Sequence, residues 1–158
     1  MKRKWLVAIL VVGALGSLVI GAVPLIGGVW LGKGLSSWRA DHMTLEELSA
    51  KAASVTSRSL PQETDEGWVF ASIDVTEGGV VGGFVRSGPF TSTAELRRSI
   101  DRLKGPMSER GCAHGWIQRI IEKGGVVRFE FEGVAAGVTL RESFSLDAGL
   151  CSRILSSG

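Results

Sequence analysis

The chain has 158 residues, of which 18 are Lys or Arg and 16 are Asp or Glu, for a formal net charge of +2 at pH 7. Four basic residues, Lys2, Arg3, Lys4 and Lys33, flank one apolar segment, and without them the chain has 14 basic and 16 acidic residues, a net charge of 14 − 16 = −2. The apparent basicity therefore belongs to the flanks of that segment, and we expect no nucleic-acid partner.

The apolar segment runs from Trp5 to Leu31. Of its 27 residues, 20 are apolar and the others are Gly, Ser and one Pro, so a helix here could span about 30 Å of hydrocarbon. We predict a basic cytoplasmic tip and a transmembrane anchor over residues 1–33. The alternative is a cleaved export signal, but the run is longer than the apolar core of such signals, and Pro24 is unfavourable beside a cleavage site.

The flanking charges also predict the orientation of the anchor. Basic residues favour the cytoplasmic side, which places the N-terminus in the cytoplasm and the rest of the chain outside, in the periplasm of a bacterial envelope. The expected membrane-flanking residues are Lys2, Arg3, Lys4, Trp5, Trp30 and Lys33. Gly13, Ser17 and Gly21 recur at every fourth position, a spacing that favours close helix packing, so self-association through this face is a further hypothesis.

A tether over residues 34–43 leads to an exported domain over residues 44–158. Thr44 with Glu47 is a capping box, and apolar residues at helical spacing follow, so a helix is predicted from Thr44 to about Thr56. Residues 59–67 are predicted to be a loop.

Two apolar runs, Trp68–Thr76 and Val80–Arg86, surround the residues Glu77-Gly78-Gly79. This arrangement predicts a β-hairpin. Gly82 and Gly83 weaken the second strand and indicate a bulge or a close approach of another part of the chain.

Ser92 with Glu95 predicts a second capping box, opening a helix that should end at Lys104, before Gly105-Pro106. Its exposed side carries a cationic patch that could dock an anionic partner, although such a run is more often a solvated helix face. The residues of this patch are Arg97, Arg98, Arg102 and Lys104.

A further helical segment, Met107–Lys123, is predicted with an interruption near residues 111–115. Residues 126–132 then alternate strictly between apolar and polar, as in an antiparallel strand with one wet face, and Val138–Leu146 is the matching strand. Glu142 interrupts the apolar row of that last strand. It is interpreted as an edge residue with its carboxylate in water, or alternatively as a functional acid.

The two cysteines, Cys112 and Cys151, are an even number in a domain that the anchor places outside the cytoplasm. We therefore predict a disulfide between them. A metal site or a cysteine nucleophile is a weaker alternative, because no partner ligands stand at metal spacing and no orienting His and acid can be identified.

No catalytic motif or cofactor motif is found, and no Gly-x-Ser-x-Gly sequence is present. The leading hypothesis is a non-enzymatic binding or assembly module with a protein partner in the envelope. The alternative is an envelope enzyme or small-ligand-binding protein with a cleft near Glu142 and His114.

A pattern of residues over the region 54–151 consists of Leu60-Pro61, Asp65, Cys112, Gly125, Phe129, Phe131 and Cys151. With this pattern, the region resembles small bacterial exported domains with one disulfide. The resemblance implies an α+β fold and no catalytic residues. Together with the predicted elements, it leads us to expect a four-stranded, mainly antiparallel sheet with two to three helices on one face.

Overall fold

The structure is a computed structural model, and it describes residues 42–64, 66–86, 88 and 90–157. The predicted anchor and most of the predicted tether lie outside these residues. Within the described ranges, no helix has both the length and the apolar character that a membrane span needs.

The described residues form a five-stranded mixed sheet and four helices, so the predicted α+β class is confirmed. The strands are β1 (Gln62–Glu63), β2 (Val69–Thr76), β3 (Gly79–Val85), β4 (Val126–Ala135) and β5 (Val138–Leu146), and the helices are α3 (Leu45–Ser57), α4 (Thr93–Cys112), α5 (Gly115–Glu122) and α6 (Ala148–Ser156). The sheet order is β1-β2-β3-β4-β5, with β3 and β4 parallel and the other pairs antiparallel.

The predicted count of four strands is corrected to five by β1, a two-residue strand inside the predicted loop. The expectation of two to three helices is corrected by α6, which Asp147 opens by accepting a hydrogen bond from the Leu150 amide at 2.8 Å. Both elements are short, so neither has the length from which a hydrophobic period can be recognised.

The hairpin of β2 and β3 forms as predicted, and the irregularity that the glycines indicated lies on the partner strand. The register of β2 shifts between Phe70 and Ser72. A Cβ on Gly82 would lie 2.9 Å from the Phe70 ring, so this glycine leaves room for an aromatic side chain of the core.

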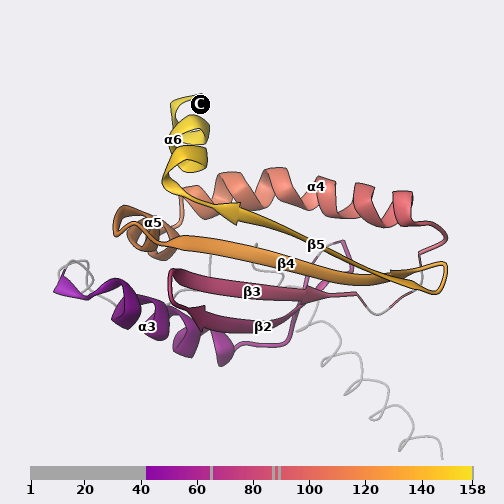
Figure 1. The fold of residues 1–158 in the computed structure, drawn as a ribbon, viewed down its shortest axis with the longest axis horizontal. Helices are drawn as coiled ribbons and strands as arrows, with labels where there is room; N and C mark the ends of the chain where they lie inside the picture. Colours follow the sequence, from indigo (N-terminus) through magenta and orange to yellow (C-terminus); the bar gives the residue numbers. More distant parts are fainter. Residues whose placement is uncertain (1–41, 65, 87, 89, 158) are drawn as a thin grey trace, which may run out of the picture.

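The helices α3, α4 and α5 pack against the sheet on the side of its buried apolar residues, as expected, and α6 packs against α4 (Figure 1). In Figure 1, α3 runs along β2, and α4 runs along β5. The apolar side chains of β4 at Val127, Phe129 and Phe131 point into this layer and are buried. The alternate β4 residues are exposed on the other face, which no described helix covers.

The predicted helix end at Lys104 is wrong, because α4 continues through Gly105 and Pro106 to Cys112. Proline removes one helix hydrogen bond, but Pro106 is exposed, so the carbonyl that it leaves unpaired lies on the solvent side. Leu103 and Met107 are buried on the opposite side of the helix, and their packing favours continuation of the helix.

Pro106→Ala is expected to raise the free energy of unfolding by about 2 kcal/mol. Proline in a helix interior is about 3 kcal/mol less favourable than alanine, and alanine gives back up to about 1 kcal/mol through a freer unfolded chain. Urea unfolding monitored by circular dichroism measures the difference. A lower midpoint in the variant would contradict a continuous α4.

Candidate interaction surface

Glu142 on β5 forms an ion-pair cluster with α4. Its carboxylate accepts a hydrogen bond from Arg97 Nε at 3.0 Å and lies 3.5 Å from Lys104 Nζ, and its side chain is 24% exposed. Lys104 also donates to Asp101 at 2.9 Å. The carboxylate is therefore paired with two cations rather than alone in water. It connects β5 to α4 across 45 residues of sequence.

The same cluster raises the pKa of Lys104 above its ordinary value of 10.5, first through the hydrogen bond to Asp101 and then through the charges of Asp101 and Glu142. Because the pKa of Lys104 is higher in the folded chain than in the unfolded chain, its charge stabilises the fold fully at pH values below the unfolded-state pKa. This stabilisation is lost as the pH rises through the folded-state pKa.

We expect the free energy of unfolding to fall as pH rises past about 10.5, and we expect Asp101→Asn to make this fall smaller. Urea unfolding from pH 9 upward tests it; identical curves for both proteins would contradict it.

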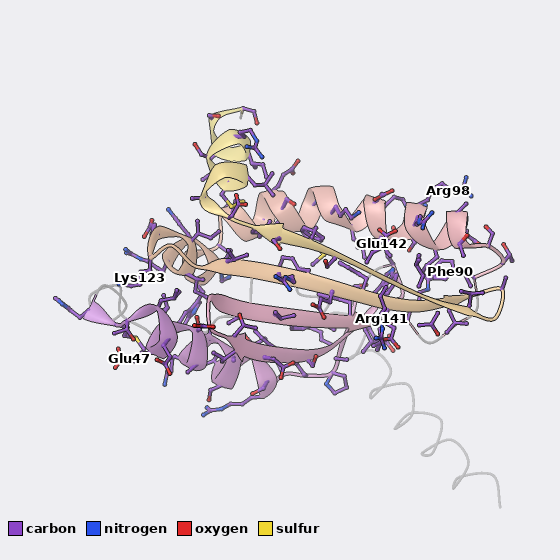
Figure 2. All side chains as sticks on the ribbon, in the orientation of Figure 1. Glu47, Phe90, Arg98, Lys123, Arg141 and Glu142 are labelled. Atoms are coloured by element: carbon purple, nitrogen blue, oxygen red, sulfur yellow. A yellow bond between two sulfur atoms is a disulfide. The ribbon has the colours of Figure 1, made fainter. Side chains whose placement is uncertain are left out.

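The predicted cationic patch is divided between different sides of α4. Arg102 reaches away from Glu142 and donates to the Glu66 carboxylate from Nη2 at 3.1 Å. Arg98 is exposed and lies on the outer side of the helix, away from the sheet (Figure 2). Only Arg97 and Lys104 remain together beside β5. The four cations therefore have different surroundings: Arg97 and Lys104 pair with Glu142, and Arg102 pairs with Glu66.

A buried polar cluster that sequence reasoning missed joins α4 to the start of the sheet. Trp68 Nε1 donates to Ser99 Oγ at 3.0 Å, and Arg86 Nη1 donates to the same oxygen at 3.1 Å. The Arg86 guanidinium also lies 4.2 Å from the centre of the Phe90 ring. Trp68 and Ser99 are separated by 31 positions, so no local pattern could have joined them.

The uncovered face of the sheet is hollowed by an open depression of about 510 Å³. Three small residues line it, Ser72 on β2, Gly83 on β3 and Ser143 on β5, and they leave space that longer side chains would fill. Glu130, Glu132 and Arg141 supply the charges around it, and Arg141 Nε donates to Glu132 at 2.7 Å. The depression is open to solvent, and both polar and apolar residues line it.

The two residues of the predicted alternative cleft, Glu142 and His114, differ in their relation to this depression. Glu142 borders the depression, whereas His114 precedes α5 and does not line it. His114 is ten positions beyond Lys104, which corresponds to about 15 Å along a helix axis. Among the described residues, no group of three or more His, Cys, Asp or Glu could hold a metal ion.

The predicted disulfide between Cys112 and Cys151 is confirmed. It joins the last residue of α4 to α6, with the two Cα atoms 5.2 Å apart. The remaining predicted site residues lie outside the described ranges. They are the membrane-flanking residues Lys2, Arg3, Lys4, Trp5, Trp30 and Lys33, and the helix-packing residues Gly13, Ser17 and Gly21.

Comparison with known proteins finds likeness in structure but not in sequence. No family model and no curated protein matches the chain. A protein of Pseudomonas aeruginosa described as secreted is similar in fold, with 15% identity and a TM-score of 0.55 over 75% of this chain and 99% of the other. EpsS, a pilotin of the type 2 secretion system of Vibrio vulnificus, has 17% identity and a TM-score of 0.53 over 68% and 91% of the two chains. At these identities, the likeness establishes a shared fold.

Proposed function

We propose that this chain is a membrane-anchored, extracytoplasmic module that binds a protein partner during assembly of an envelope complex, without catalysing a reaction. The observation that carries the proposal is the uncovered sheet face with its open depression. An exposed surface that mixes charged, polar and apolar residues suits a protein partner that covers it. The fold that the chain shares with a secretion-system pilotin supports an assembly role.

The disulfide supports the extracytoplasmic part of the proposal. Disulfides persist in oxidising compartments such as the bacterial periplasm and are rare in the cytoplasm. The bond between Cys112 and Cys151 agrees with the orientation that the charges around residues 1–33 predict.

Site-specific photo-crosslinking of the full chain in cell membranes tests the proposal. A photoreactive residue at Ser72, in the depression, should give one adduct of defined mass whose partner is identified by mass spectrometry as an envelope protein. The same residue at Ser152, exposed on α6, is the matched control and should give none. Glu130→Arg, which reverses a charge in the depression, should remove the adduct. The proposal fails if Ser72 gives no adduct or if both positions give the same one.

A further inference from the structure

β5 is an edge strand with a free side. It is the last strand of the sheet and pairs only with β4 among the described residues. Its pairing is uninterrupted from Val138 to Leu146, with no bulge and no proline. The opposite edge differs, because there β1 is only two residues long and β2 carries a register shift. Bulges and very short strands are two of the devices by which proteins protect sheet edges, and β5 has neither; its charged residues are Arg141 and Glu142.

The hydrogen bonds of β4 show which backbone groups of β5 are free. The Glu132 and Val134 carbonyls accept bonds from Arg86 and Phe90, on the β3 side. Even-numbered residues of β4 therefore face β3, and its odd-numbered residues face β5. Since Phe131 is opposite Glu142, the even-numbered residues of β5 bond to β4. The backbone groups of Thr139, Arg141, Ser143 and Ser145 point outward, and no described residue bonds to them.

The side chains along this edge separate into two rows. Leu140, Glu142 and Phe144 lie on the helix side, and Leu140 and Phe144 are only half-buried. Arg141 and Glu142 are on opposite sides of β5 (Figure 2). A further strand paired with β5 would place every second side chain on the helix side, under α4. These side chains would lie beside Leu140, Glu142 and Phe144.

The charges on the adjoining side of α4 favour an acid at the middle position of that added strand. The side chain of Arg97 is 60% exposed and donates to Glu142 from Nε. Glu142 takes only the Nε donor of Arg97, so a second carboxylate beside it would meet a guanidinium whose Nη donors Glu142 does not use.

From this geometry we propose that the β5 edge binds an extended segment of a protein partner, which adds a sixth strand with apolar, acidic and apolar side chains at alternate positions under α4. Main-chain hydrogen bonds to the odd-numbered β5 residues provide the binding energy, and the helix-side contacts provide the selectivity. This inference rests on the proposed function, since it specifies how one segment of the partner is held.

Titration with a synthetic peptide, Thr-Val-Thr-Glu-Thr-Val-Thr with blocked ends, tests the proposal on the full chain in detergent micelles. Amide chemical shifts should change at residues 139–145 and at Arg97. The peptide with Lys in place of Glu should bind about tenfold more weakly, because it loses a charge-assisted hydrogen bond. The proposal is overturned if no shift occurs at millimolar peptide, or if the shifts fall on β1 and β2.

Backbone methylation of the peptide distinguishes strand addition from other modes of binding. The peptide residues that bond to β5 are the central threonines, because their side chains lie on the uncovered face. N-methylation of those two threonines should abolish binding, whereas N-methylation of the two valines should leave it unchanged. Equal effects of the two modifications would overturn strand addition.

Substitution in β5 gives the matched test on the protein. Ser143→Pro removes one outward N–H and no hydrogen bond to β4, so it should abolish peptide binding, whereas Ser143→Ala should retain it. Melting curves check that both variants are folded. If the Ser143→Pro variant is not folded, the methylated peptides provide the test of strand addition. A Ser72 adduct in cells together with no peptide binding would overturn this inference alone and leave the proposed function standing.

Discussion

Replacing both cysteines with alanine, in the variant Cys112→Ala/Cys151→Ala, is expected to lower the free energy of unfolding by about 4 kcal/mol. The disulfide joins residues that are 39 positions apart, and a loop of that length loses conformational freedom in the unfolded chain. A loss of this size is a large part of the stability of a domain of ordinary size. Urea unfolding of the oxidised protein and of the variant measures it.

The disulfide also holds α6 in place. Cys151 is the only buried residue of α6, and Leu150 and Ile154 are only partly covered. We therefore expect amides 148–156 to lose protection from hydrogen exchange first in the variant. Wild-type protein reduced with dithiothreitol is the control and should unfold at the same urea concentration as the variant. An unchanged midpoint in the variant would contradict a stabilising disulfide.

The sequence was informative where the determining contacts are local. Thr44 and Glu47 are three residues apart, and their reciprocal hydrogen bonds form as predicted, so the start of α3 is correct. At α4 the prediction holds in part. Ser92 accepts from the Glu95 amide, but the Glu95 carboxylate accepts from Thr91 rather than from the Ser92 amide. The alternation of apolar and polar residues also predicted β4 and β5, because the apolar residues of each strand lie on one face.

Long-range contacts decide the features that the sequence did not reveal. Local propensity ends the helix at Pro106, but the buried neighbours Leu103 and Met107 extend it. The role of Glu142 depends on Arg97, which lies 45 positions away. The depression depends on Gly83 being placed beside Ser72, and that placement follows from strand register. These contacts exist only once the sheet order is set.

Trp68→Ala is expected to lower the free energy of unfolding by about 3–5 kcal/mol, the usual loss for a large aromatic side chain removed from a core. Trp68 is fully buried, and its ring meets Phe131 edge-on, with the ring centres 5.2 Å apart. The truncation leaves a cavity between β4 and α4. It also removes the indole donor to Ser99, which connects the sheet to the helix.

Trp68→Phe separates the two contributions. It keeps an aromatic ring and loses the indole N–H, while Ser99 Oγ still accepts from Arg86 and so keeps a partner. The expected loss is about 1–2 kcal/mol, from the smaller ring and one net hydrogen bond. Urea unfolding of both variants and the wild type gives the two differences. A Trp68→Phe variant as unstable as Trp68→Ala would show that the hydrogen bond to Ser99, rather than packing against Phe131, joins α4 to the sheet.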